Sequence, residues 1–466
     1  MGQRRHHRAA GGTQRPAGKE GNRVKHHAAR RALVCGQMPA GAVAILATAP
    51  EVPRNADSDY PYRHDSYFYY LTGFTEPEAV AVLVAAQGST PSRSILFCRQ
   101  KNAEREIWDG FRYGPEAARA AFGFDEAYAI DDIDSELPRL LANAAALYCP
   151  LAHSAAFDAR IKGWMDKVRG LSRSGVTAPA SVHDLLVLLD EMRVFKDEHE
   201  QALMQRAADI SARAHERAMR ATRPGMFEYE IEAELLHEFR RSGAQSPAYA
   251  SIVASGAHAC VLHYNANNAQ TRDGDLVLID AGCEFDSYAS DITRTWPVNG
   301  RFSAPQKQLY ELVLAAQSAA LAAIVPGQRY SAIHDAALKV LAQGMLDFGL
   351  LDKAKFGGVD DVVAERAFAQ FYMHGTGHWL GLDVHDAGAY RDVTLDERPS
   401  RILQPGMALT VEPGLYVRPA PGVPEQFWNI GIRIEDDVVV TASGRKILSG
   451  AAPKLVADIE KAMQHG

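Results

Sequence analysis

The 466-residue sequence has few cysteines and no long hydrophobic run. The cysteines form no C-x-x-C pair, which argues against a disulfide framework and a zinc knuckle and favours a reducing compartment. They are Cys35, Cys98, Cys149, Cys260 and Cys283. The longest apolar runs, such as residues 79–86, reach about half of the ~20 residues that cross a bilayer. We therefore expect a cytoplasmic protein without a membrane partner.

Basic residues are concentrated at the N-terminus and are in deficit elsewhere. Residues 1–31 carry nine Lys and Arg against one Glu, a net charge of +8. Because the whole chain has a net charge of −7, residues 32–466 carry −15. This segment has no apolar core that would make it a secretory signal. Its composition predicts a disordered tail over residues 1–31, with nucleic-acid contact as the alternative. The acidic remainder argues against nucleic acid as the main partner.

The rest of the chain is too long for one hydrophobic core, which predicts two domains. Apolar runs indicate the strands of a mixed sheet at residues 42–49, 68–74, 79–86, 94–99 and 144–149, while residues 163–179 suggest loops and residues 182–195 a helix. Asp197 and Glu200 form a D-x-x-E capping pattern that starts a new helix. We therefore predict an N-terminal α/β domain over residues 32–195 and a second domain over residues 196–466.

Four carboxylates lie in or after strand-like runs of the second domain: Asp280, Asp291, Glu412 and Glu435. A single Asp after a strand is more often a turn or cap residue. Glu435 also shares a strand face with Arg433, so an ion pair is the simpler interpretation of that motif. If all four converge, however, their repulsion in a low-dielectric site needs cations, and two divalent ions would balance four negative charges.

Three histidines fall within a glycine-rich segment: His374, His378 and His385. The glycines would each cost a helix about 1 kcal/mol relative to Ala, which predicts a shaped loop. Gly375 stands where the H-E-x-x-H motif needs Glu. A lone histidine is as often structural, but three at this density favour a site.

Carboxylate oxygens with one imidazole suit Mn²⁺, with Mg²⁺, Co²⁺ or Zn²⁺ as alternatives. Two such ions lower the pKa of a shared water and present hydroxide to a carbonyl carbon. The residues themselves therefore predict a dinuclear metallohydrolase.

At these residues the chain resembles aminopeptidase P, the Xaa-Pro aminopeptidase, within the pita-bread metallopeptidases that include methionine aminopeptidase and prolidase. The motifs are LHYNANN (262–268), DGDLVLIDAGCEFDSYASDITRTWPVNG (273–300), HGTGHWLGLDVHD (374–386), RILQPGMALTVEPGLYV (401–417) and GIRIEDDVVV (431–440). Residues 56–80 extend the resemblance into the first domain. It implies an α/β (α+β) chain with a mixed-sheet, creatinase/prolidase-like domain followed by a pita-bread catalytic domain.

The resemblance also implies roles for the residues. Asp280 would bind one metal, Asp291 and Glu435 would bridge both, and His378 with Glu412 would complete the other site. Glu412 would also act as general base.

Further residues are implied to contact substrate or to support the ligands. His263 and His385 would steady the tetrahedral intermediate, and His374 would lie at the proline pocket. Arg433 would orient the carboxylates, while Tyr416 and Trp108 would line the pocket. Trp108 would come from a neighbouring subunit of a homotetramer or dimer. Pro399 replaces an Arg of the bacterial relatives, which puts any substrate contact of that Arg in doubt.

The expected activity is release of an N-terminal residue from peptides with proline at the second position. A tertiary amide has no N–H, so a site that packs against the ring accepts it. The alternatives are a prolidase, which cleaves only Xaa-Pro dipeptides, and a non-catalytic binding protein on the same fold.

Overall fold

The computed structural model describes residues 17–464, with side chains from residue 24 onward. It divides into two compact units, Met1–Leu189 and Asp190–Gly466, which we call the N-terminal and C-terminal units. The division falls inside helix α7 (Leu186–Val194), and the predicted boundary after residue 195 lies just beyond this helix. In the described part of the chain, no helix is long and apolar enough to cross a membrane.

A six-stranded mixed sheet forms the centre of the N-terminal unit, with strand order β4-β3-β2-β1-β5-β6. Strand β1 pairs antiparallel with β2 and parallel with β5. The strands are β1 (Val43–Ala47), β2 (Val80–Val84), β3 (Arg93–Cys98), β4 (Glu126–Ala129), β5 (Leu147–Cys149) and β6 (Val182–Asp184). The predicted mixed sheet is present.

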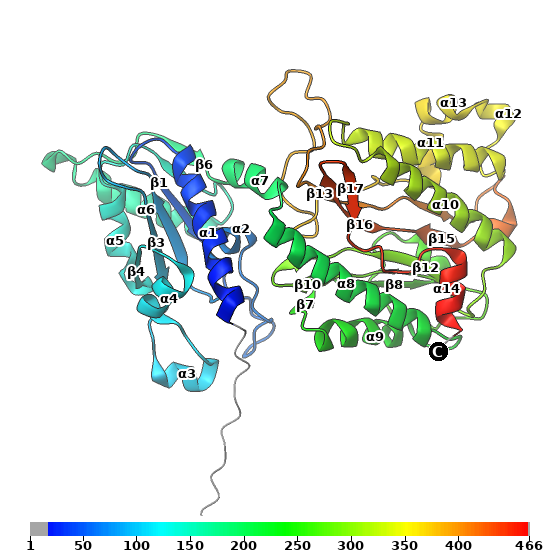
Figure 1. The fold of residues 1–466 in the computed structure, drawn as a ribbon, viewed down its shortest axis with the longest axis horizontal. Coiled ribbons are helices and arrows are strands. Elements are labelled where there is room, and N and C mark those ends of the chain that lie inside the picture. The colour runs from blue at the N-terminus through cyan, green and yellow to red at the C-terminus, as the bar shows by residue number, and fades with distance from the viewer. Residues whose placement is uncertain (1–16, 465–466) are drawn as a thin grey trace, which may run out of the picture. The chain divides into compact units, whose positions relative to one another are not determined.

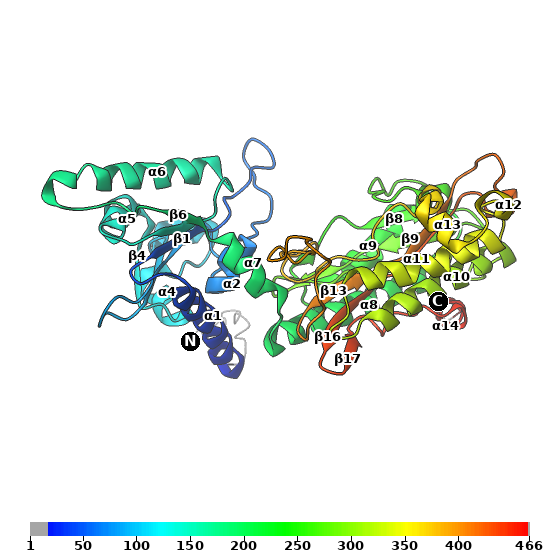
Figure 2. The same cartoon turned by 90° about the horizontal axis from the view of Figure 1, so that it is seen from above.

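Helices cover both faces of this sheet. They are α1 (Ala17–Gln37), α2 (Ser66–Thr72), α3 (Ala103–Asp109), α4 (Gly114–Phe122), α5 (Ile133–Leu141) and α6 (Ala155–Arg169). Figure 2 shows α5 and α6 on one face and α1 with α4 on the other. Leu137 from α5 and Trp164 from α6 pack against Ile45 and Phe97 of the sheet in the core.

Three local predictions in this unit were wrong. Residues 68–72 of the strand predicted at 68–74 lie in helix α2, because Asp65 accepts a hydrogen bond from the Phe68 amide at 2.8 Å and Gly73 ends the helix in the left-handed conformation. These caps override the strand preference of an aromatic run. Residues 182–195 divide into strand β6 and helix α7, and the loop predicted for residues 163–179 begins inside helix α6.

The predicted tail is also different over residues 17–31, which lie in helix α1. His27, Arg30 and Arg31 are buried, although their charge suggested a solvated segment. The ring of His27 bonds the Tyr70 carbonyl, and Arg31 donates to the Leu71 carbonyl at 2.9 Å. These basic groups therefore satisfy the carbonyls at the end of α2. Residues 1–16 of the predicted tail lie outside the described residues.

In the C-terminal unit, two helix pairs alternate with groups of strands. The helices are α8 (Glu198–Ala221), α9 (Glu228–Arg241), α10 (Ala304–Ala323), α11 (Ser331–Asp347), α12 (Lys353–Phe356), α13 (Val359–Ala364) and α14 (Val456–Met463). Helix α8 starts at the predicted capping box of Asp197 and Glu200. Figure 1 shows α8 beside α9, and α10 beside α11.

The strands of this unit form small antiparallel sheets rather than one large one. They are β7 (Ser246–Pro247), β8 (Ile252–Ser255), β9 (Leu276–Asp280), β10 (Cys283–Phe285), β11 (Tyr288–Ala289), β12 (Thr293–Pro297), β13 (Ala408–Val411), β14 (Gly414–Val417), β15 (Ile430–Arg433), β16 (Asp436–Thr441) and β17 (Gly444–Ile447). The sheet orders are β12-β9-β8, β13-β16-β17, β11-β10-β7 and β14-β15.

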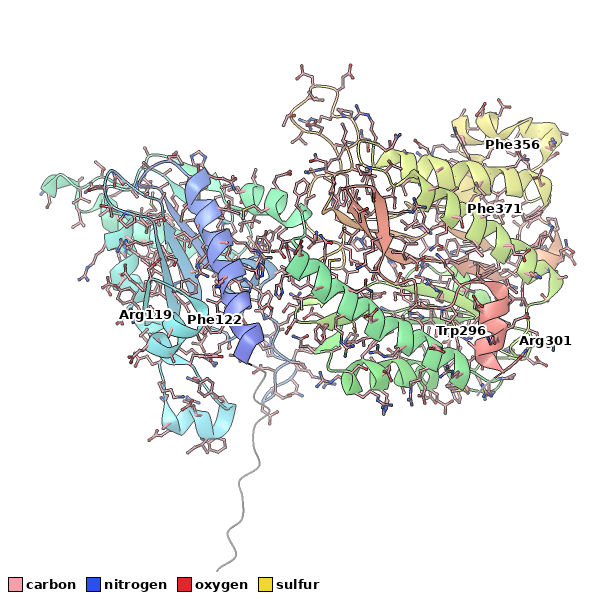
Figure 3. All side chains as sticks on the ribbon, viewed as in Figure 1. Arg119, Phe122, Trp296, Arg301, Phe356 and Phe371 are labelled. Carbon is pink, nitrogen blue, oxygen red and sulfur yellow. The ribbon has the colours of Figure 1, made fainter. Side chains whose placement is uncertain are left out.

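One apolar core joins these sheets to the helices. Trp296 from β12 and Phe371 are buried within it, whereas Arg301 lies exposed at its edge (Figure 3). Within β9 and β12, residues 276–279 and 293–297 are buried throughout. The functional side chains are therefore held at the ends of rigid, fully packed strands.

Candidate metal centre and active site

A cavity of about 570 Å³ opens in the C-terminal unit, where strand ends from several sheets meet. Its lining includes the predicted acidic residues and all four predicted histidines. They are Asp280, Asp291, Glu412, Glu435, His263, His374, His378 and His385, with Arg433 and Tyr249 beside them. The cavity is thus built from segments that are far apart in the sequence.

The first pair of carboxylates is brought together by the pairing of β9 with β12. Asp280 ends β9 opposite Thr293, and Asp291 lies two residues before Thr293. The hydroxyl of Tyr249 contacts both side chains, at 2.5 Å from Asp280 Oδ1 and also within hydrogen-bond reach of Asp291. One phenol therefore connects the two acids.

The second half of the site comes from the glycine-rich segment and from β13 to β16. His378 Nε2 lies 3.4 Å from Asp291 and 3.6 Å from Glu412. Ligand atoms of Asp291, His378 and Glu435 all lie within 4.8 Å of one another. This spacing suits donors that share a cation.

Neighbouring side chains fix the ligand orientations. Arg433 donates to Asp280 at 2.7 Å and to the Tyr416 hydroxyl at 2.9 Å. Thr293 Oγ1 donates to Glu435 at 2.6 Å. The simple ion pair of Arg433 with Glu435 is therefore not the arrangement that these side chains adopt.

The ring of His378 is fixed from its other side. Its Nδ1 bonds the carbonyl of Trp379 at 2.9 Å, which leaves Nε2 facing the carboxylates. Metal-binding histidines are commonly oriented by such a contact.

Burial and mutual repulsion shift the pKa values of the cluster. Burial, followed by the charges of Asp291, Glu412 and Asp280, raises the pKa of Glu435 well above its usual value. Burial also raises the pKa of Glu412 to about 7, even though His378 opposes this shift. Such shifts identify carboxylates that lack enough positive charge around them.

The donor set fits divalent cations that prefer oxygen. It contains four buried or half-buried carboxylates and one imidazole, and no cysteine lines the cavity. Arg433 is the only arginine or lysine in the lining of this cavity, so one fixed cation faces four carboxylates. Hard, oxygen-preferring ions would supply the missing charge.

Two loops carry the remaining histidines to the cavity. His263 lies in a segment anchored by the fully buried Glu228, which accepts hydrogen bonds from the Ser255 amide at 2.8 Å and the Tyr264 hydroxyl at 2.7 Å. His385 stacks on His378, with ring centroids 3.9 Å apart. Both histidines are exposed toward the cavity.

His374 differs from these two because its Nε2 bonds the Tyr416 hydroxyl at 2.9 Å. Burial lowers the pKa of His374 to about 4, so its ring is neutral at physiological pH. Tyr416 itself is fully buried and lies behind the cavity lining, where it connects His374 to Arg433.

Trp108 is the one predicted site residue outside this unit. It lies on α3 of the N-terminal unit and is 82% exposed. Tyr249, by contrast, was not predicted from the sequence. It follows β7 in an irregular segment, and nothing in its local pattern distinguishes it from an ordinary surface tyrosine.

Family models match both units. Residues 202–442 match metallopeptidase family M24, and residues 27–148 match the N-terminal domain of aminopeptidase P. The chain belongs to metallopeptidase family M24. Family membership implies divalent metal ions, in agreement with the donor set described above.

Similar proteins share nearly the whole chain. The Xaa-Pro aminopeptidase of Escherichia coli (strain K12) is 45% identical over 434 residues, which cover 93% of this chain and 96% of that protein. The Xaa-Pro aminopeptidase of Haemophilus influenzae is 46% identical, with coverage of 93% and 96%. The chain is therefore a metallo-aminopeptidase.

Solved structures agree with the fold. Aminopeptidase PepP of Pseudomonas aeruginosa has a TM-score of 0.91 at 47% identity, covering 95% of this chain and 98% of that chain. Aminopeptidase P from E. coli with the inhibitor Pro-Leu gives 0.90 at 44% identity, with coverage of 95% and 98%. The expected mixed-sheet domain followed by a pita-bread domain is confirmed.

Proposed function

We propose that this metallo-aminopeptidase removes the N-terminal residue from peptides that have proline at the second position. The main support is one observation: four carboxylates and four histidines line a single cavity in a chain 45% identical to a Xaa-Pro aminopeptidase over 93% of its length. The relatives named Xaa-Pro aminopeptidase favour this activity over that of a prolidase. The filled ligand positions argue against a non-catalytic binding protein.

Five residues would hold two divalent ions: Asp280, Asp291, His378, Glu412 and Glu435. The resemblance to aminopeptidase P implies that Asp291 and Glu435 would serve both ions. In support, their ligand atoms lie within 4.8 Å of each other and of His378, and Asp291 shares the Tyr249 hydroxyl with Asp280. We propose Mn²⁺, because the set is mostly carboxylate oxygen with one imidazole. When bound, the ions lower the pKa of a water molecule and polarise the carbonyl of the scissile bond.

Glu412 is the proposed general base. Its carboxylate lines the cavity beside the other proposed ligands, 3.6 Å from His378 Nε2. A general base must lie within hydrogen-bond reach of the proton that it abstracts. Glu412 would therefore take a proton from the attacking water and deliver it to the leaving proline nitrogen.

His263 and His385 are the proposed donors to the developing oxyanion. Both line the cavity from loops outside the carboxylate cluster, so their rings are available to a substrate carbonyl. Donors aimed at charge that develops in the transition state lower the barrier more than donors to the ground state. His374, which is neutral and held by Tyr416, would face the proline ring.

Three finer assignments are also proposals. Trp108 would contact substrate from a neighbouring subunit, which requires a homo-oligomer, a tetramer or dimer. The large exposed apolar side chains of Trp108 and Ile107 on α3 support an interface there. We also propose a cytoplasmic location, supported by five buried cysteines that form no disulfide with one another.

The test is a comparison of two substrates with Mn²⁺ present. An aminopeptidase of this type cleaves Arg-Pro-Pro as well as, or faster than, the dipeptide Ala-Pro. A dipeptide-only profile would instead establish a prolidase. Metal analysis of the purified protein addresses the binding-protein alternative, which requires both fewer than about two divalent ions per chain and no activity restored by Mn²⁺.

A further inference from the structure

His385 depends on its backbone for its position in the cavity. Its ring stacks on His378 at 3.9 Å, and within residues 17–464 the ring makes no hydrogen bond. Stacking fixes the plane of a ring but only weakly fixes where its nitrogens point. The segment that carries His385, residues 381–386, must therefore be held by other contacts.

Asp386 holds this segment through a buried ionic cluster. Its Oδ1 accepts from Arg193 Nη2 at 2.5 Å, and its Oδ2 accepts from Lys196 Nζ at 2.8 Å. All three side chains are 1% exposed. The Lys196 ammonium also donates to the Arg193 carbonyl at 2.7 Å, which closes the cluster.

The cluster also sets the shape of the backbone around His385. Asp386 Oδ1 accepts from the Asp383 amide at 3.2 Å, and the Asp386 amide donates to the Trp379 carbonyl at 2.9 Å. Arg193 Nη2 additionally reaches the Asp383 carboxylate at 2.8 Å. The chain is therefore held on both sides of His385, because Asp383 and Asp386 bind the same guanidinium.

The close packing at Gly381 indicates how tightly this segment is held. A Cβ at Gly381 would lie 2.3 Å from Asp386 Oδ2 and 2.9 Å from Lys196 Cε. The chain can pass over the ion pair only because this residue has no side chain. Its carbonyl accepts from the Ala289 amide at 2.8 Å, so the segment is also tied to β11.

We propose that Lys196, Arg193 and Asp386 are positioning residues that hold His385 in its orientation toward the substrate carbonyl. This inference rests on the proposed function of His385 as a donor to the oxyanion. The side chains of the cluster do not line the cavity, so its influence on the reaction passes through the backbone: through residues 381–386 to His385, or through the Trp379 carbonyl, which binds both the Asp386 amide and His378 Nδ1. Only the first route is abolished when His385 is alanine. A displacement of about 1 Å at a catalytic group is enough to cost roughly a hundredfold in rate.

A double-mutant cycle with His385 tests this route. The variants are Lys196→Met, His385→Ala and the combination, each assayed with Arg-Pro-Pro at saturating Mn²⁺. Lys196→Met is expected to lower kcat about tenfold with KM within about twofold, the signature of a contact realised in the transition state. In the His385→Ala background the same change is expected to lower kcat by less than about twofold, because coupled residues are not additive.

Two further variants serve as a control and as a substitute for Lys196→Met. Lys307→Met removes a half-exposed lysine that pairs with Glu311 in the same unit, and is expected to leave kcat and KM unchanged. If Lys196→Met does not fold, Lys196→Arg keeps the charge but changes its geometry beside Gly381. Its smaller loss of kcat is expected to disappear in the same way when His385 is alanine. Metal content and thermal unfolding are measured for every variant.

The outcomes separate the inference from the proposed function. A wild-type enzyme that leaves Arg-Pro-Pro intact contradicts the proposed function itself. If the wild type is active, three results would each contradict the positioning role. In the first, the fold-losses in kcat of Lys196→Met and His385→Ala multiply in the double variant. In the other two, Lys196→Met and Lys196→Arg both retain full kcat, or His385→Ala leaves kcat unchanged.

Discussion

Two adjacent buried acids in the C-terminal unit have opposite electrostatic environments. Glu435 points into the cavity among three other carboxylates, and its pKa lies well above the usual value because of burial and those charges. Asp436, the next residue, is equally buried but pairs with Arg294 at 2.8 Å and Lys454 at 2.5 Å. These cations outweigh the effect of burial and lower the pKa of Asp436 to about 2.

The comparison shows where the protein supplies counter-charges and where it does not. Successive residues of an extended chain point to opposite sides, so one short segment places Glu435 and Asp436 in separate environments. Around Asp436, Ser449 and Gln317 complete the hydrogen bonding at 2.7 and 3.0 Å. In the cavity lining Arg433 is the only permanently charged cation, which leaves most of the carboxylate charge to be balanced by metal ions.

The strongest test of this contrast is removal of a carboxylate that would serve both ions. Asp291→Ala is expected to reduce kcat by at least about a thousandfold, because neither ion would keep its geometry. The fold is expected to persist, since the change relieves repulsion among the carboxylates. Turnover of Arg-Pro-Pro, metal content and far-UV circular dichroism check these expectations.

The matched control is Asp360→Asn, an exposed acid on α13, which should behave as wild type. Substantial turnover by the Asp291 variant, with two ions bound, would show that the bridging assignment is wrong.

The next largest effect is the pH dependence of stability after treatment with a chelator. A carboxyl whose folded pKa is raised binds its proton more tightly in the folded state, so it destabilises the fold once the pH exceeds its unfolded pKa. For Glu412, with a shift from 4.5 to about 7, stability falls across this interval. The loss is on the order of 3 kcal/mol at one pKa unit per 1.4 kcal/mol.

His378 continues the trend at higher pH. Its contacts with Asp291 and Glu412 outweigh burial and raise its pKa to about 9, so the stability it adds below pH 6.5 is lost as the pH rises through 9. Asp436 has the opposite sign: its stabilisation is complete above its ordinary pKa of 3.8 and is lost as the pH falls toward 2. Urea unfolding between pH 2 and 10, with and without Mn²⁺, measures these slopes. Identical slopes in both conditions would contradict this account of the cavity.

A smaller effect is expected from the ion pair behind the cavity. Lys454→Met removes one cation from Asp436 and should lower the free energy of unfolding by about 2–3 kcal/mol. This is below the roughly 3–5 kcal/mol for a fully buried pair, because the Lys454 side chain is 22% exposed. Since Lys454 does not line the cavity, kcat per folded molecule should stay within about twofold of wild type. A large loss of kcat in Lys454→Met with unchanged stability would show that this ion pair serves catalysis rather than the fold.

The sequence was enough to find the acidic residues but not to separate their roles. Strand ends and glycine-rich turns identified Asp280, Asp291 and Glu412, because those features are local. In the run of three acids at 435–437, local pattern does not show which side chain meets Arg294 and Lys454. That depends on Ser449 and Lys454, which approach only in the folded chain.

Other differences also come from long-range contacts. The aromatic run at residues 68–74 reads as a strand until Asp65 and Gly73 are recognised as helix caps. The sequence of α1 predicts a solvated basic tail, because the partners of its buried arginines are carbonyls at residues 70 and 71, some forty residues away. Charge composition alone does not separate a buried basic face from a disordered one.

The smallest predicted effect concerns Tyr249, the residue that the sequence did not reveal. Its hydroxyl contacts Asp280 and Asp291, so Tyr249→Phe removes the single hydrogen-bond donor that these two acids share and keeps the shape of the ring. We expect the Kd for Mn²⁺, measured by titrating activity, to rise about tenfold, the lower end of the range for partners of metal ligands.

Tyr310→Phe is the matched control for Tyr249→Phe. It removes a hydroxyl that donates to the Lys454 carbonyl at 2.7 Å in the ion-pair region, so it should lower stability by about 1 kcal/mol and leave the Kd unchanged. Because both changes delete one buried phenol hydroxyl, a difference in Kd reports the location of the group rather than its chemistry. Equal Kd values for the two variants would mean that Tyr249 does not support the metal ligands.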